Sequence, residues 1–373
     1  MAMSPGNPDQ QTLIRSYRPG DEEAIIKVLV EVFGRWPGFD LDYQQLDHWR
    51  WRYLSEFSNT RHVCVVEVAK RIVGCLHYSK VEMKISDGVY PGTLAGDIAV
   101  LEPFRSLGLT ARLAEKTFGL REKTGEQFTY FETRNERVIK QYRRIAHTLP
   151  IQSRHLIRVG RISEHLRRKH QSWSWIKGPL YKLAQSAQYI ALGSIRAKTN
   201  TEATISESGA LDERFDGFWE KVSQHYGLIV KRDRKFLAWR YGDSRGGRFH
   251  VLCAEDGKEL LGYAVLRINK RNPAYSLGYV VDLLCLPGRE SVAATLLQES
   301  LAFFDRNEVN AINCLVPRHH PYFKLYLANG FVDTLERTQV FLRLSGPLEQ
   351  QLEALEELPP GRVFYAYGDI DTI

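Results

Sequence analysis

Residues 97–113 read Asp-Ile-Ala-Val-Leu-Glu-Pro-Phe-Arg-Ser-Leu-Gly-Leu-Thr-Ala-Arg-Leu, and they carry the strongest structural signal in the chain. The first residues are typical of a buried strand, and the last ones have the periodicity of an amphipathic helix. The loop between them contains Pro103, Arg105 and Gly108. Such a loop can direct successive backbone N–H groups at one point, where the N-terminus of the helix adds positive potential. The stretch therefore predicts an anion site suited to a pyrophosphate.

The two halves of the chain repeat each other, which predicts a duplicated fold. Trp51-Arg52-Tyr53 recurs as Trp239-Arg240-Tyr241, 188 residues later. Asp97 is matched by Asp282, 185 residues later, so the offset shrinks slightly along the chain, as small loop deletions would cause. The duplicated Trp-Arg-Tyr motif favours a role in the fold, and the alternative is an aromatic and cationic wall of an acceptor groove.

Each half has the sequence pattern of one mixed unit of helices and strands. In the first half we expect strands at 13–18, within 63–78, at 94–100 and at 128–133, and helices at 22–34, 109–125 and 135–145. This order predicts a mostly antiparallel sheet with one parallel crossover at the strand–loop–helix step. We therefore expect an α+β protein with two such domains in tandem, each a central mixed sheet flanked by helices.

In this context residues 97–113 resemble the cofactor motif of the GNAT acyltransferase superfamily. In that family a strand, an [R/Q]xxGx[G/A] loop and a helix bind the pyrophosphate of acetyl-CoA. The resemblance implies acetyl-CoA as co-substrate without a metal, and a strand end whose backbone bonds the pantetheine arm. The cofactor-binding residues it implies are Ile98, Ala99, Val100, Arg105, Ser106, Leu107, Gly108, Leu109, Thr110 and Asn135.

A second landmark of the family is an Asn at the end of the next strand, followed seven residues later by Tyr. Here these are Asn135 and Tyr142, two helical turns apart and so on one helix face. The resemblance implies that Asn135 contacts the cofactor arm and that Tyr142 is the general acid for the leaving thiolate. A phenol keeps its proton at neutral pH, which suits that role. The alternative is a core tyrosine on a helix face.

The sequence departs from the family pattern at several positions. Thr110 stands where the family usually has Gly or Ala, and Ala146-His147 replaces a Gly-Phe pair. The second half departs further, because Val292 stands where the first half has Gly108, and a β-branched residue disfavours the backbone pose that glycine allows. We expect a degenerate second GNAT-like domain that shapes the acceptor cleft or stabilises the first, the alternative being a second active site.

The sequence does not single out one general base. The acceptor amine must lose a proton, and the candidates are Asp97, Glu132 and, more distantly, Glu82. The recurrence of Asp97 as Asp282 favours a structural role for it. Alternation along 128–133 places Tyr130 and Glu132 on the strand face opposite Phe131. Deprotonation through water needs no dedicated carboxylate and stays an alternative.

The excess of positive charge in the chain is concentrated in one segment. The formal net charge is +7, and residues 161–198 carry eight Lys or Arg against one Glu. We expect a helical linker there that packs its aromatic residues on a domain, the alternative being contact with anionic lipid or an acidic partner. Nucleic-acid binding is unlikely, since no motif for it accompanies the charge. The chain is therefore predicted to divide into an N-terminal domain at 12–160, a linker at 161–198, a C-terminal domain at 199–345 and a C-terminal tail at 346–373.

Composition sets the remaining bounds. The chain has 373 residues, of which 43% are hydrophobic and 25% charged, as in globular proteins. No apolar run approaches the ~18 residues that span a membrane, and the N-terminus lacks the features of a secretory signal. The five cysteines are odd in number and without CxxC spacing, so we expect buried thiols in the cytoplasm and no metal site.

The resemblance to the GNAT superfamily implies an acyl-CoA-dependent N-acyltransferase, with acetyl passing from acetyl-CoA to a primary amine by direct attack on the thioester. An amino sugar or a cell-envelope precursor is one candidate acceptor, by similarity to tandem GNAT proteins of bacteria and archaea. Two alternatives stay open. One is a Fem-type transferase that takes aminoacyl groups from tRNA, and the other is a non-catalytic scaffold that binds CoA or a glycan.

Overall fold

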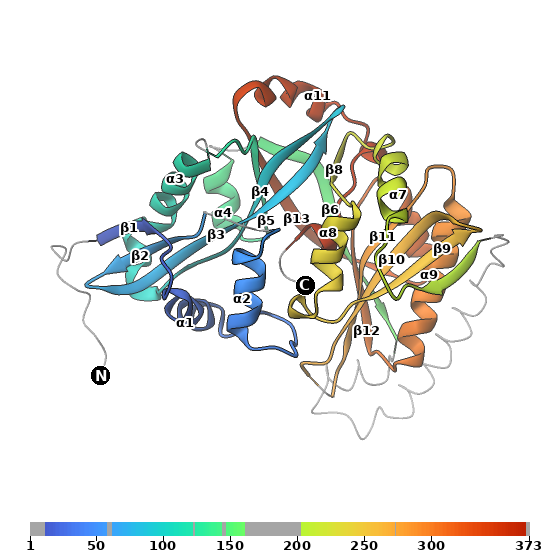
Figure 1. Cartoon of the computed structure of the whole chain (residues 1–373), viewed down its shortest axis with the longest axis horizontal. Coiled ribbons are helices and arrows are strands. Elements are labelled where there is room, and N and C mark those ends of the chain that lie inside the picture. Colours follow the sequence, from blue (N-terminus) through green and yellow to red (C-terminus); the bar gives the residue numbers. More distant parts are fainter. Residues whose placement is uncertain are drawn as a thin grey trace.

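The fold is known from a computed structural model, which describes residues 12–57, 62–121, 124–143, 147–160, 203–272 and 274–370. Within these residues, all strands belong to one mixed sheet of 13 strands, with helices packed along it (Figure 1). The basic segment 161–198 lies outside the described residues, so its predicted helices and its contact with lipid stay predictions.

The first half follows the predicted order. Its strands are β1 (Thr12–Ser16), β2 (Cys64–Val68), β3 (Arg71–Ile85), β4 (Gly88–Val100) and β5 (Phe128–Thr133). Its helices are α1 (Glu22–Phe33), α2 (Gln45–Leu54), α3 (Leu109–Arg121) and α4 (Glu136–Tyr142). Strands β1 to β4 pair antiparallel in sequence order, and β4 pairs with β5 in parallel, which places the crossover where the sequence predicted it.

The second half repeats this unit. Its strands are β7 (Thr204–Glu207), β8 (Leu228–Val230), β9 (His250–Asp256), β10 (Glu259–Asn269), β11 (Leu277–Cys285) and β12 (Ala311–Pro317). Its helices include α7 (Arg214–Ser223), α8 (Arg234–Leu237), α9 (Glu290–Arg306) and α10 (Pro321–Ala328). Strands β9 to β11 are antiparallel, and β11 pairs with β12 in parallel.

The two halves exchange their last strands. Strand β6 (His147–Val159) follows the first half in sequence but pairs with β12 of the second. Strand β13 (Val332–Leu344) follows the second half but pairs with β5 of the first, and β6 and β13 pair with each other. The exchange covers two edges that would otherwise expose unpaired backbone groups. The halves are therefore one continuous sheet in space, although each is a separate repeat in sequence.

The C-terminal segment also joins the halves. After β13 the chain forms a 3-10 turn (Gly346–Gln351) and α11 (Leu352–Glu356). Residues 363–370 are then almost entirely buried. The side chain of Asp369 accepts hydrogen bonds from Arg232, and its carbonyl accepts one from the hydroxyl of Tyr130 at 2.7 Å. The segment predicted as a tail is thus part of the core as far as residue 370.

The duplicated Trp-Arg-Tyr motifs meet at the junction of the halves. The rings of Trp51 and Trp239 stack with centroids 5.1 Å apart and planes inclined by 20°. Trp51 lies in α2, and Trp239 lies in the π-helical turn Ala238–Gly242 that follows α8. The predicted role in the fold is confirmed for the tryptophans.

The predicted burial of the cysteines agrees with the structure. All five cysteines are buried and none is in a disulfide. Of the helices described, none combines the length and hydropathy needed to cross a lipid bilayer.

Candidate active site

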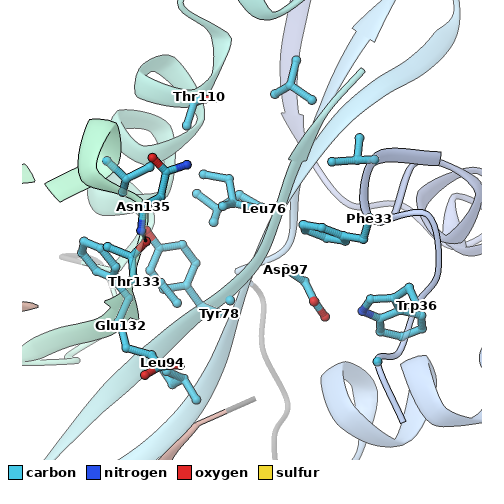
Figure 2. A pocket seen from close by; sticks show the side chains of 18 of the residues that line it. Phe33, Trp36, Leu76, Tyr78, Leu94, Asp97, Thr110, Glu132, Thr133 and Asn135 are labelled. Carbon is cyan, nitrogen blue, oxygen red and sulfur yellow. Dashed lines mark hydrogen bonds between the residues drawn. The ribbon is translucent and has the colours of Figure 1, made fainter. Parts of the chain in front are cut away.

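A cavity of about 790 Å³ opens in the first half where β4 and β5 part. The parallel pairing of these strands ends at Leu94, opposite Tyr130, and residues 95–100 then diverge from β5. The segment between α1 and α2 closes the cavity on one side, and the loop before α3 and helix α4 close it on the other (Figure 2). The cavity therefore lies at the strand–loop–helix step that the sequence singled out.

A bulge in β4 shapes the wall of the cavity. Pairing with β3 shifts register between Cys75 and His77, and Asp97 adopts a φ of 46°. His77 donates from Nδ1 to the carbonyl of Asp97 at 3.0 Å and accepts at Nε2 from the indole of Trp49 at 3.0 Å. Asp is one of the few residues that tolerate this backbone region. The buried His77 thus fixes the pose that presents Asp97 to the cavity.

The end of β4 offers a backbone donor to the cavity. The N–H of Leu101 bonds the carbonyl of Val73 on β3 at 2.9 Å, so the N–H of Val100 points the opposite way, toward the cavity. The carbonyl of Val100 accepts a hydrogen bond from Nε of Arg105 at 3.0 Å. Arg105 therefore ties the loop to the strand end while its side chain lines the cavity.

The loop after β4 has the conformation that the glycine was expected to allow. A 3-10 turn spans Glu102–Leu107, Gly108 ends it at a φ of 64°, and α3 begins at Leu109. A Cβ at Gly108 would meet no atom within 4 Å, so the backbone conformation alone requires the glycine, and no neighbouring atom would block a side chain. Thr110 lines the cavity from the first turn of α3.

Not every predicted cofactor residue lines the cavity with its side chain. Ile98, Val100, Arg105, Thr110 and Asn135 do. Ala99 and Leu109 are buried in the core, whereas Ser106, Leu107 and Gly108 are exposed on the loop. The backbone of these five remains a candidate for cofactor contact, which is the role that an anion-binding loop needs.

Helix α4 brings Asn135 and Tyr142 to one wall, as their spacing predicted. The ring of Tyr142 packs edge-on against Phe131 with centroids 4.5 Å apart. Burial raises the pKa of the Tyr142 hydroxyl, so it stays protonated at neutral pH. On β5, which stays paired with β13 as far as Thr133, both Phe131 and Glu132 line the cavity. The side chain of Phe131 packs on Tyr142 and Phe341, whereas Tyr130 bonds Asp369, so neighbouring residues have different partners, as the alternation predicted.

The three candidate bases are separated by the structure. Asp97 and Glu132 both line the cavity, from different walls (Figure 2). The hydroxyl of Tyr53 donates to Oδ2 of Asp97 at 2.6 Å. Glu82 lies elsewhere, in an ion pair with Lys231 at 2.9 Å, so it is not a candidate for this site.

The wall opposite α4 comes from residues that the sequence did not single out. Phe33, Arg35, Trp36, Pro37 and Gly38 line the cavity between α1 and α2. The second half holds this segment in place. Arg267 of β10 packs its guanidinium over the ring of Phe39 at 4.1 Å and donates to the carbonyl of Asp40 at 2.7 Å. Contacts between such distant segments have no local sequence signal.

The corresponding place in the second half is filled. Strands β11 and β12 also part, after Val280 and Cys314, but the hydroxyl of Tyr322 on α10 accepts a hydrogen bond from the N–H of Cys285 at 3.0 Å. Cys285 corresponds to Val100 in the repeat. Tyr322 is buried, so a protein side chain takes the position that is open in the first half.

Comparison with known proteins yields matches in structure alone. No sequence model of a protein family matches the chain, and no curated protein matches it in sequence. A GCN5-related N-acetyltransferase from Anabaena variabilis superposes with a TM-score of 0.60 at 10% identity, over 90% of this chain and 73% of that one.

Two further structures match over similar lengths. N-myristoyltransferase from Saccharomyces cerevisiae, with bound myristoyl-CoA, superposes with a TM-score of 0.59 at 13% identity, over 92% of this chain and 86% of that one. A probable N-acyltransferase of unknown function from Enterococcus faecalis superposes with a TM-score of 0.59 at 11% identity, over 90% of this chain and 72% of that one. At these sequence identities the structural similarity establishes the fold alone. The chain has a doubled GNAT fold, whose two units share one sheet.

Proposed function

We propose that the protein is an acyl-CoA-dependent N-acyltransferase whose active site is the cavity of the first half. One observation carries the proposal. The parted strands, Arg105 of the loop that ends at Gly108 with positive φ, and the half-buried phenol of Tyr142 all border a single cavity. The pyrophosphate would lie at the loop and the start of α3, and the pantetheine arm would run along residues 98–100.

The reaction would proceed by direct attack. The neutral amine nitrogen forms a bond to the thioester carbonyl carbon, and the oxyanion is stabilised by the N–H of Val100. The C–S bond then breaks, and Tyr142 donates its proton to the departing thiolate. The nitrogen releases its proton to Asp97, from which it passes to water. Water restores the proton of Tyr142, so the balance is amide plus free CoA.

Acetyl is the acyl group that we propose, because the parallel pairing of β4 and β5 resumes at Leu94 and closes the floor of the cavity. Leu94 is 8% exposed, so the floor is formed by a packed side chain. A longer chain would have to displace it. The myristoyl-CoA bound by one structural neighbour makes longer acyl groups the alternative that must be measured.

The test is calorimetric titration of acetyl-CoA, and of longer acyl-CoA thioesters, into the wild-type protein. Binding at one site per chain supports the proposal, since the position that matches this cavity in the second half is occupied by Tyr322. Two sites would make the second half a cofactor site as well. Absence of binding at millimolar cofactor would contradict the proposal and favour a tRNA-dependent or a non-catalytic role.

A further inference from the structure

The same tyrosine–aspartate pair occurs in both halves. In the first half the hydroxyl of Tyr53 donates to Asp97 at 2.6 Å. In the second half the hydroxyl of Tyr241 donates to Asp282 at 3.4 Å. The tyrosines come from the duplicated Trp-Arg-Tyr motif, and the aspartates come from the corresponding strands β4 and β11. The two pairs can therefore be compared as versions of one site.

In the second half a cation of the chain completes the pair. Nε of Arg232 lies 2.9 Å from Oδ2 of Asp282, and both side chains are fully buried. The guanidinium also packs over the ring of Phe364 at 4.6 Å. Asp282 also accepts a hydrogen bond from the hydroxyl of Tyr263 at 3.3 Å, and Arg232 pairs with Asp369 as well. The arrangement thus combines tyrosine hydroxyls, a carboxylate, a buried cation and an aromatic face.

In the first half the cation is missing from the described residues. The position seven residues before the motif is Arg232 in the second half and Gln44 in the first, and Gln44 is exposed. No ion pair of Asp97 occurs in the part of the chain that the structure describes. The carboxylate instead faces the cavity.

The chain's own cations around the cavity are engaged elsewhere or lie at its rim. Arg105 donates to the carbonyl of Val100, and the guanidinium of Arg52 lies 5.6 Å from the centre of the Tyr53 ring. Arg35 is exposed on the segment between α1 and α2. None of the three takes the place at Asp97 that Arg232 takes at Asp282.

Aromatic rings border the open site. Figure 2 shows the carboxylate of Asp97 directed toward Trp36, with the ring of Phe33 beside it. Trp36 is 5% exposed, whereas Phe33 is 47% exposed, so one ring is part of the wall and the other borders the entrance. A carboxylate beside aromatic rings can bind an organic ammonium ion.

We propose that Asp97 binds the acceptor as an ammonium ion, in the place that the guanidinium of Arg232 occupies in the second half. The inference rests on the proposed function, and it specifies the substrate class as a cationic primary amine on a group slim enough to pass Phe33 and Trp36. Alcohols and amines that are uncharged at neutral pH bind poorly to such a site. A carboxylate partner stabilises the charged amine, so turnover rises with pH as the ammonium ion loses its proton.

The experiment uses n-butylammonium and its uncharged analogue n-butanol as probes of the full-length protein. Saturation-transfer NMR at pH 7 measures the binding of each, with and without CoA. We expect saturable binding of the cation alone, weakened about ten-fold or more in Asp97→Asn, because a charge-assisted contact is lost. Asn also tolerates the positive φ at this position, so the variant should fold. Trp36→Leu should weaken binding about two- to five-fold.

Glu82→Gln is the control, since it removes a carboxylate that lies outside the cavity in an ion pair with Lys231, and it should change cation binding less than two-fold. Equal binding of both probes, or unchanged cation binding in Asp97→Asn, overturns the inference. A titration of CoA in the same samples keeps the two proposals apart. CoA binding without cation binding rejects the ammonium site alone, and cation binding without CoA binding rejects the acyltransferase alone.

Discussion

The two halves of this chain have one architecture, yet the first contains a cavity and the second contains packed side chains at the same place. In the first half β4 and β5 part around open space, and the Val100 N–H faces it. In the second half Tyr322 bonds the corresponding N–H of Cys285, and Arg232 neutralises the corresponding carboxylate. A doubled GNAT fold can therefore keep its scaffold while side chains fill, in one copy, the place that is open in the other.

The halves should differ most in how much the matching aspartates, Asp97 on β4 and Asp282 on β11, contribute to the free energy of unfolding. Arg232→Met would leave the carboxylates of Asp282 and Asp369 buried without their shared cation. We expect a loss of about 3–5 kcal/mol in the free energy of unfolding. The measurement is urea denaturation followed by circular dichroism.

Asp97→Asn is the counterpart in the first half, where the carboxylate faces a cavity. It should cost about 1 kcal/mol, the value of one hydrogen bond. Equal losses in the two variants would mean that both aspartates are structural, and the contrast between the halves would not hold.

The next effect concerns the two helix tyrosines that match in the repeat. Tyr142→Phe should lower kcat about 100-fold, because general acid catalysis contributes about 10²–10⁴-fold, while the Kd for acetyl-CoA stays within two-fold. The assay is release of free CoA thiol with a primary amine as acceptor. Tyr326→Phe in the second half is the control and should leave kcat unchanged. A kcat of Tyr142→Phe equal to that of the wild type would assign Tyr142 to packing against Phe131.

The loop glycine allows the comparison to be tested by copying one half into the other. Gly108→Val reproduces the residue that the second half has at Val292. We expect acetyl-CoA to bind about 10–100-fold more weakly, since a β-branched residue cannot hold a φ of 64° without strain and the loop must change conformation. Calorimetry measures the change.

Gly257→Val serves as the matched control for strain. Gly257 has a φ of 60°, also in open space, in the turn between β9 and β10 far from the loop. It should lower stability by a similar amount and leave cofactor affinity intact. A Gly108→Val protein that binds CoA as tightly as the wild type would show that the loop is not the pyrophosphate site.

The parts of the site that could be predicted from sequence are those with local signals. The Gly108 loop, Asn135 and Tyr142 lie within 40 residues and follow the periodicity of a strand and two helices. Asp97 was a candidate base because it lies on the strand before the loop, although its match with Asp282 in the repeat favoured a structural role. Such signals depend on spacing along the chain, and spacing is preserved when the chain folds.

The parts that could not be predicted depend on contacts between distant segments. The exchange of β6 and β13 leaves no trace in their apolar patterns, because a strand has the same alternation whichever neighbour it pairs with. The wall of Phe33 and Trp36 is likewise set by the second half. Tyr322 did carry a signal, since it is an aromatic residue where the first half has Val138, but the sequence does not say that its hydroxyl reaches β11.

The smallest effect should come from the contact through which the second half shapes the first. Arg267 is 1% exposed, stacks on Phe39 and bonds the carbonyl of Asp40, so it positions the segment that contains Trp36. Arg267→Met keeps much of the apolar volume but removes the hydrogen bonds. We expect the KM for the amine acceptor to rise about five-fold, roughly the 1 kcal/mol of one hydrogen bond, with kcat and the affinity for acetyl-CoA little changed.

A raised acceptor KM with an unchanged kcat would show that Arg267 positions the segment that contains Trp36. General destabilisation would instead lower the fraction of active protein and so reduce kcat. Arg267→Lys retains a cation that can reach the carbonyl, and it should recover part of the acceptor KM. Lys221→Met removes an exposed cation that pairs with Glu259 in the same half, and it should change neither constant. A fall in kcat or in cofactor affinity in Arg267→Met, without a rise in acceptor KM, would restrict the second half to stabilising the first.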